Sequence, residues 1–143
     1  MNASAAVETK LLEAAEQLLP ELGTRRREID ELRQLPQDLA DKLAKLGFYR
    51  LVVPEELGGL GISPTTFCKL CETLATANGS TAWCIFFFFT SQYLFGALPP
   101  SQLQKMLQNP DVITSGVFAD SGTAMFEERD GQAGYVINGH WRW

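Results

Sequence analysis

The fold of this chain is decided by one apolar stretch, Thr81-Ala82-Trp83-Cys84-Ile85-Phe86-Phe87-Phe88-Phe89-Thr90-Ser91-Gln92-Tyr93-Leu94-Phe95-Gly96. Successive helical side chains are about 100° apart, so four adjacent phenylalanines leave no polar face, and such a helix is buried all round or lies in lipid. A transmembrane helix needs about 20 apolar residues, whereas this run is shorter and is interrupted at residues 90–92. We therefore predict the central helix of a soluble helical domain, over about residues 81–98, with no membrane span. Its polar notch at Ser91 and Gln92 can face a cavity.

Helical patterns continue on both sides of this stretch. Apolar residues recur at helical spacing over residues 5–22, and further helices are predicted at about 25–33, 36–46, 64–78 and 101–107. The expected N-caps are Thr24, Ser63 and Ser80, because their side-chain oxygens can accept hydrogen bonds from free backbone N–H groups. Residues 48–54 read as a short extended segment, and residues 55–61 as a glycine-rich loop without the motif of a phosphate or dinucleotide site.

The pattern changes after residue 108. Residues 112–118 are rich in β-forming side chains, residues 131–134 read as a turn, and Asn138-Gly139 is a favoured tight-turn dipeptide. We therefore predict a hairpin around Asn138-Gly139, with residues 135–137 and 140–143 as its strands. The predicted fold is mainly α: an N-terminal helical domain, residues 1–108, followed by the start of a β domain, residues 109–143. Because two strands hold together poorly alone, we expect a fragment of a longer protein.

Composition and charge narrow the function classes. Twelve basic and seventeen acidic side chains give a net charge of −5, which argues against nucleic acid, because phosphate binding needs a concentrated basic patch. The chain opens without a basic-then-apolar leader, and three cysteines suit a reducing compartment, so a cytoplasmic protein is expected. Cys68 and Cys71 form a C-x-x-C, but inside a helical segment and with only Cys84 and His140 as further soft ligands. We expect buried structural thiols and no metal site.

Three elements in order resemble the acyl-CoA dehydrogenase superfamily. Residues 47–61, GFYRLVVPEELGGLG, are similar to its proline-glutamate-glycine segment, and residues 134–143, GYVINGHWRW, are similar to its strand pair. Between them, Gly79-Ser80-Thr81-Ala82-Trp83 and the long apolar helix follow in the family's order. The resemblance covers nearly the whole chain. It implies an N-terminal helical domain, a middle β domain and a C-terminal helical bundle, with a flavin between the last two; this chain corresponds to the first domain and the start of the second.

Two branches of the superfamily differ after the first β-strand. Acyl-CoA dehydrogenases usually carry T-E-P-x-x-G-S-D there, whereas this chain has the shorter Phe118-Ala119-Asp120-Ser121-Gly122-Thr123-Ala124. With the tryptophan-rich hairpin, this version is more similar to flavin-dependent monooxygenases, which take reduced flavin from a separate reductase and hydroxylate aromatic or related rings. The resemblance thus implies an oxidoreductase with FMN or FAD, a small-molecule substrate, a flavin reductase partner and a homo-oligomer. The alternative is an acyl-CoA dehydrogenase, which desaturates an acyl thioester with FAD.

The resemblance also assigns residues by position. Those expected to approach the flavin are Phe118, Ala119, Gly122, Thr123 and Trp143, and backbone N–H groups near a glycine can bind a flavin edge or phosphate. Those expected to line the substrate cavity, on one face of the central helix, are Trp83, Phe87 and Ser91. Several monooxygenases have a histidine at the place of Ser91; a serine can orient a phenol but does not titrate near neutral pH. No catalytic residue is assigned.

Each assignment has a structural alternative. Trp83 and the phenylalanines are core residues in the simplest interpretation, because large apolar side chains are usually buried. His140 is then a surface residue of a β-strand, residues 127–130 are a charged loop, and residues 25–27 are a solvated helix face with internal ion pairs. For the isolated chain, the non-enzymatic alternative is a helical interaction domain without a cofactor.

Overall fold

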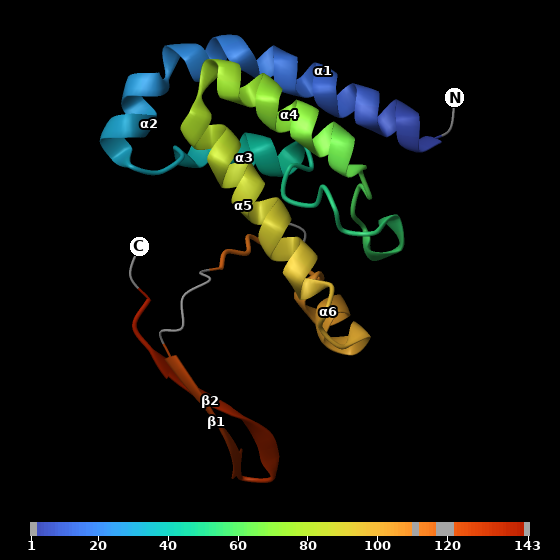
Figure 1. The fold of residues 1–143 in the computed structure, drawn as a ribbon, viewed down its shortest axis with the longest axis vertical. Helices are drawn as coiled ribbons and strands as arrows, with labels where there is room; N and C mark the ends of the chain where they lie inside the picture. The colour runs from blue at the N-terminus through green and yellow to red at the C-terminus, as the bar shows by residue number, and fades with distance from the viewer. Residues whose placement is uncertain (1–2, 110–111, 117–121, 142–143) are drawn as a thin grey trace.

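A computed structural model describes residues 3–109, 112–116 and 122–141 as a run of helices followed by a two-stranded antiparallel sheet (Figure 1). The elements are α1 (Ala3–Thr24), α2 (Arg26–Leu32), α3 (Gln37–Lys45), the 3-10 helix η1 (Glu55–Leu57), α4 (Pro64–Ala77), α5 (Gly79–Phe95), α6 (Pro100–Met106), β1 (Gly122–Arg129) and β2 (Gln132–Gly139). The mainly α fold class is confirmed. Within the described ranges, no helix is long and apolar enough to cross a membrane. The domain division at residue 108 stays a prediction.

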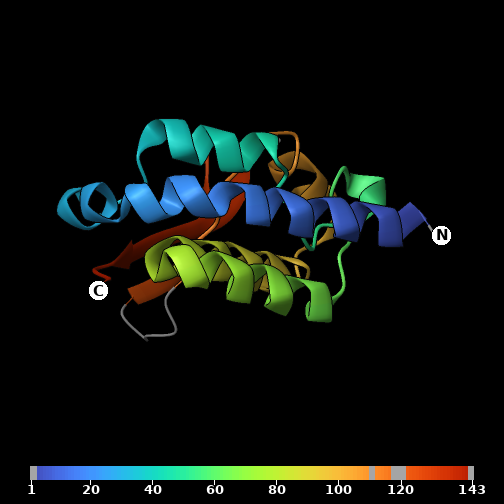
Figure 2. The same cartoon turned by 90° about the horizontal axis from the view of Figure 1, so that it is seen from above.

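The core lies where α1 packs on α4 and α4 packs on α5. Seen from above in Figure 2, α1 runs between α3 and α4. The side chains that α1 buries recur at three- and four-residue spacing: Leu11, Ala15, Leu18 and Leu22. Burying one leucine side chain stabilises a fold by about 1.5–3 kcal/mol, so this apolar stripe is what holds α1 to the domain.

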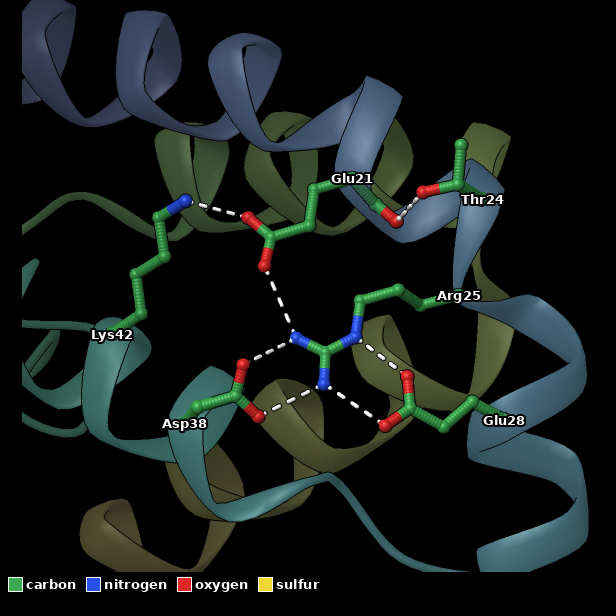
Figure 3. Close-up of polar contacts among 6 residues, drawn as sticks. All are labelled: Glu21, Thr24, Arg25, Glu28, Asp38 and Lys42. Carbon is green, nitrogen blue, oxygen red and sulfur yellow. Dashed lines mark hydrogen bonds and ion pairs between the residues drawn. The ribbon is translucent and has the colours of Figure 1, made fainter.

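An ion-pair cluster around Arg25 joins α1, α2 and α3 (Figure 3). The Arg25 guanidinium lies 3.2 Å from the carboxylate of Glu21, 2.7 Å from that of Glu28 and 2.6 Å from that of Asp38. Lys42 lies 2.5 Å from Glu21. Hydrogen bonds from Arg25 lower the pKa values of Glu28 and Asp38, and the one from Lys42 lowers that of Glu21. The first residue of the basic run is therefore a tether between helices.

The start of α4 confirms the cap predicted at Ser63. Its Oγ accepts a hydrogen bond from the Thr66 N–H at 3.2 Å, and Pro64 takes the first helical position. Glu8 of α1 reaches the same helix end, where its carboxylate accepts from the Ser63 N–H at 2.8 Å and the Thr66 hydroxyl at 2.7 Å. These bonds lower the pKa of Glu8 and fasten α1 to the start of α4.

The other two predicted caps are wrong. The Thr24 hydroxyl donates to the Glu21 carbonyl at 2.9 Å, and α2 begins without a side-chain cap. At α5, the cap is Asn78, whose Oδ1 accepts from the Thr81 N–H at 2.8 Å, so Ser80 lies inside the helix. Asparagine and serine are similarly good caps, and the sequence offers both within three residues.

The glycine-rich loop folds back onto the segment before it, which is a series of turns and bends and not the extended segment predicted. The Leu60 N–H donates to the Arg50 carbonyl and the Gly61 N–H donates to the Val53 carbonyl, each at 3.0 Å. A Cβ at Gly59 would overlap the Val53 carbonyl, so the close approach of the two backbones requires glycine there.

The hairpin predicted around Asn138-Gly139 is wrong. The turn lies at Asp130-Gly131, where both residues have positive φ (53° and 74°), as favoured two-residue hairpin turns require. This turn lets β1 and β2 pair along all eight residues of each strand, with Gly122 opposite Gly139 at the open end. A turn at Asn138 would pair far fewer residues.

Three smaller expectations fail in the same region. Glu127, Glu128 and Arg129 belong to β1 and are not a loop, and only Asp130 lies in the turn. His140 is exposed, as predicted, but follows β2 instead of lying in a strand. Residues 112–116 form no regular strand, and residues 117–118 lie outside the described residues.

Candidate functional site

Helix α5 is buried on one side only, which corrects the prediction of all-round burial. Ile85 is fully buried, whereas Trp83 is 61% exposed, Tyr93 76% and Leu94 51%. The sequence pattern correctly indicates that α5 is apolar on every side. A fully buried helix also needs neighbours on every side, and the described residues cover only one side of α5. The uncovered side is an exposed apolar surface of the kind that binds a ligand or another protein surface.

Three aromatic side chains on this uncovered side form what we call the aromatic wall: Trp83, Phe86 and Phe87. The Trp83 and Phe87 ring centroids are 4.9 Å apart with planes at 62°, and those of Trp83 and Phe86 are 5.7 Å apart at 21°. Phe86 and Phe87 meet edge to face at 6.0 Å. Such geometries are the favourable ones for aromatic pairs, so the rings support each other while remaining partly accessible.

Ser91 lies two turns beyond Trp83 on α5 and is only 4% exposed. It faces the segment of residues 112–116, because a Cβ built at Gly116 would lie 3.9 Å from the Ser91 Oγ. Along this segment burial alternates, with Thr114 buried and its neighbours Ile113 and Ser115 exposed.

Thr114 was missed from the sequence. Its Oγ1 is buried and, among the described residues, has no hydrogen-bond partner. Buried hydroxyls are nearly always paired, so this unpaired one, two residues before the glycine that approaches Ser91, is a candidate partner for a polar group of a ligand. The sequence of residues 112–116 has no pattern that identifies it, because the alternation of burial appears only in the structure.

Gln92, the second residue of the polar notch, has a structural role. It is 8% exposed, and its Nε2 donates a hydrogen bond to the Tyr49 carbonyl. It also lines a cavity of about 430 Å3 between the end of α5, α6 and residues 52–54. Other side chains of the lining include Val53, Leu103 and Leu107. The notch therefore faces two directions, with Gln92 toward this cavity and Ser91 toward residues 112–116.

Of the residues assigned to the flavin, the structure describes Gly122 and Thr123, whereas Phe118, Ala119 and Trp143 lie outside the described residues. Gly122 and Thr123 are exposed at the start of β1. In the sheet of the described residues β1 pairs only with β2, so its outer edge has unpaired backbone N–H groups. The hairpin lies away from α1 and α4 in Figure 1. Exposed residues on a free strand edge can donate backbone N–H groups to a planar cofactor.

The thiols are only partly as predicted. Cys71 and Cys84 are half-buried, and burial raises the pKa of Cys71 to about 11 and also raises that of Cys84. Cys68 is exposed, which corrects the expectation that all three are buried. Among the residues that the structure describes, no group of three or more His, Cys, Asp or Glu side chains is placed to hold a metal ion.

Comparisons with known proteins agree with the motifs. Residues 7–107 match the family described as acyl-CoA dehydrogenase, N-terminal domain. The indole-3-acetate monooxygenase of Acinetobacter baumannii is 38% identical over 117 residues, which are 80% of this chain and 28% of that protein. The flavin-dependent monooxygenase oxygenase subunit HsaA of Rhodococcus jostii is 33% identical over 128 residues, 88% of this chain and 32% of that protein.

The fold has the same relatives. The crystal structure of the HsaA monooxygenase from M. tuberculosis matches 95% of this chain and 36% of its own with a TM-score of 0.84, at 28% sequence identity. The chain therefore spans about a third of the length of the relatives that it matches.

Proposed function

The chain belongs to the acyl-CoA dehydrogenase family, and from this premise we propose that it is the N-terminal helical part of a flavin-dependent monooxygenase that hydroxylates an aromatic or related ring. One observation carries the proposal: on α5 the aromatic wall is followed, one helical turn after Phe87, by the buried hydroxyl of Ser91. The relatives named as monooxygenases support the same reaction class. A ring substrate stacks on aromatic faces, and its polar substituent needs a hydroxyl or amide partner.

The substrate side of the proposal rests on Trp83, Phe87 and Ser91, joined by Thr114. Trp83 and Phe87 would hold the ring and exclude water from it, since the exposed Trp83 indole packs edge to face against the partly buried Phe87 ring. Ser91 and Thr114 would orient the polar substituent, Thr114 being the hydroxyl that lacks a partner among the described residues. None of the four titrates near neutral pH, so their roles are binding and orientation and not proton transfer.

The cofactor side rests on Gly122 and Thr123, together with Phe118, Ala119 and Trp143. The residues that the structure describes suit a flavin, because Gly122 and Thr123 are exposed and β1 has a free edge that can donate N–H groups. Reduced flavin would supply the electrons with which one atom of O2 is inserted into the ring. FMN and FAD share the ring system, so either suits this edge.

Partners follow from the same proposal. An oxygenase that uses reduced flavin needs a second protein to reduce it, and the R. jostii relative is itself described as an oxygenase subunit. We therefore propose a flavin reductase as partner. A homo-oligomer as the working state, which the resemblance to the superfamily implies, is a separate proposal. The expected cytoplasmic location stays a prediction.

The decisive experiment assays the natural polypeptide that contains this chain, with reduced FMN or FADH2 supplied by a reductase. Indole-3-acetate is the first substrate to try, since the A. baumannii relative is named for it. Oxygen-dependent hydroxylation supports the proposal. Desaturation of an acyl thioester linked to an electron acceptor would establish the dehydrogenase alternative instead. Binding of neither flavin, in the same protein, would favour the non-catalytic interaction domain.

Variants separate the wall from the rest of α5. Trp83→Ala should raise KM for a ring substrate about tenfold or more, as expected for the loss of an aromatic anchor worth about 1.5 kcal/mol. Tyr93→Ala is the matched control, because Tyr93 is also an exposed aromatic of α5 but lies outside the wall. Equal effects of the two substitutions would contradict the assignment of Trp83.

A further inference from the structure

At the open end of the hairpin, the Trp141 ring packs on the paired glycines Gly122 and Gly139, which we call the seat of the ring. Gly122 and Gly139 are directly opposite each other, and the indole of Trp141 lies against both. A Cβ at Gly139 would lie 2.5 Å from the indole Cη2, and a Cβ at Gly122 would lie 3.0 Å from its Cζ2. A separation of 2.5 Å does not occur between carbon atoms that are not bonded, and 3.0 Å is shorter than nearly all real contacts, so the ring occupies space that a side chain at either glycine would need.

The two glycines are not there for backbone freedom. Their φ values are not positive, unlike that of Gly131 in the turn, so an alanine could adopt either backbone conformation. At Gly139 the three nearest atoms to such a Cβ all belong to the Trp141 indole, whereas at Gly122 the indole shares the crowding with the Asn138 carbonyl oxygen, each at 3.0 Å. This distinguishes a packing role from the conformational role that glycine has in most turns.

The seat continues a row of cross-strand pairs. Side chains of paired residues lie on one face, and pairs two positions apart share that face, so Gly122–Gly139 is in line with Ala124–Ile137 and Phe126–Tyr135. Phe126 and Tyr135 pack with ring centroids 5.5 Å apart. Trp141 thus ends an apolar row, at the end where Gly122 and Thr123 begin β1.

We propose that Trp141 is a positioning residue, which fixes the backbone of Gly122 and Thr123 for the flavin by packing on the Gly122–Gly139 pair. This inference rests on the proposed function, because it assigns a purpose to the residues of the flavin edge. The Trp141 ring makes this contact while remaining 46% exposed.

The test is a double-mutant cycle between Gly139 and Trp141, read by amide hydrogen exchange in the whole chain. Trp141→Ala should speed exchange at Gly122 and Thr123 about two- to tenfold, the value of one cross-strand or aromatic contact. Gly139→Ala should do the same by displacing the indole, and the double variant should be no worse than Trp141→Ala alone. Trp141→Phe, which keeps a ring, should restore most of the protection.

Phe126→Ala is the matched control. It removes an aromatic pair from the same face of the same hairpin, so it should speed exchange near Phe126 and Tyr135 more than at Gly122 and Thr123. An even rise in exchange along the whole hairpin in Trp141→Ala would indicate a general loss of stability. In that case the positioning role is wrong. If the effects of Gly139→Ala and Trp141→Ala on the exchange rates are additive, the Trp141 ring does not pack on Gly139 as described.

Flavin titration then separates this inference from the proposed function. In a protein that binds FMN or FAD, Trp141→Ala and Gly139→Ala should weaken flavin binding together, and Phe126→Ala should not. Unchanged flavin affinity despite faster exchange would overturn the positioning role but leave the seat standing. A wild-type protein that binds neither flavin would overturn the proposed function, and with it the flavin part of this inference.

Discussion

Gln92, in the second half of α5, donates a hydrogen bond from its side-chain Nε2 to the backbone carbonyl of Tyr49. The Tyr49 hydroxyl donates in turn to the Ala40 carbonyl of α3 at 2.9 Å. One polar side chain inside an apolar helix therefore links α5 to the loop after α3 and, through it, to α3. The polar notch that interrupts the phenylalanine run is in part a structural tether.

Replacing Gln92 by methionine keeps the length and flexibility of the side chain but removes its donor. We expect the free energy of unfolding to fall by about 1 kcal/mol, the usual net value of one hydrogen bond. Urea unfolding measures this change. Gln104→Met in α6 is the control, because Gln104 is exposed and such substitutions usually change stability by less than about 0.5 kcal/mol. Equal effects of the two would show that the Tyr49 bond contributes nothing.

Alanine substitutions at two glycines should change the stability of the fold in opposite directions. Gly59→Ala should destabilise the chain by about 2 kcal/mol or more, because its Cβ would overlap the Val53 carbonyl and backbone cannot yield as a side chain can. Gly23→Ala should stabilise it by up to about 1 kcal/mol, since Gly23 lies within α1 and a Cβ there meets nothing within 4 Å. Thermal unfolding of both variants checks the signs, and a stable Gly59→Ala protein would contradict the tight loop.

The three cysteines should react at clearly different rates. Cys68 is exposed, whereas Cys71 and Cys84 are half-buried with raised pKa values, chiefly because burial disfavours the thiolate. At pH 8 a thiol reagent should modify one cysteine quickly and two slowly, and Cys68→Ser should remove the fast phase. Reaction of Cys71 should accelerate as the pH approaches its pKa of about 11. A fast phase of two equivalents would show that Cys71 is accessible.

Local chemistry explains which parts of the fold were predictable. The Ser63-Pro64 start of α4 was found because the cap and the first-turn proline are properties of adjacent residues. The hairpin was misplaced because Asp130-Gly131 and Asn138-Gly139 are both good tight-turn dipeptides, and only the length of the resulting ladder decides between them. That length depends on residues far along the chain.

The site was less predictable for a similar reason. Periodicity shows that α5 is apolar on every side, but which side stays uncovered depends on how α4 packs against it, so the exposure of Trp83 was not foreseen. Thr114 and Trp141 carry no motif of their own. Thr114 matters through the burial pattern of residues 112–116, and Trp141 through two glycines opposite each other in the strands.

The Arg25 cluster predicts a dependence of stability on pH. The folded-state pKa values of Glu21, Glu28 and Asp38 are lowered from ordinary values of 4.5 for glutamate and 3.8 for aspartate. A carboxyl group with a lowered pKa stabilises the fold above its ordinary pKa, and this contribution is lost as the pH falls through the lowered value. Arg25→Gln should therefore lower the melting temperature at pH 7, and the difference should shrink as the pH is lowered toward 2, because protonation of the carboxyl groups removes the charged partners of Arg25.

Arg27→Gln is the control for this last prediction. Arg27 pairs with Glu31 on the open surface of α2, where both side chains are exposed, so its loss should change little at either pH. High salt should shrink the Arg25→Gln effect only in part, because the Arg25 side chain is 18% exposed and screening acts mainly on exposed charges. If the two variants melt alike at pH 7, the cluster in Figure 3 does not hold α1, α2 and α3 together. A gap that persists at pH 2 would point instead to lost packing of the arginine stem.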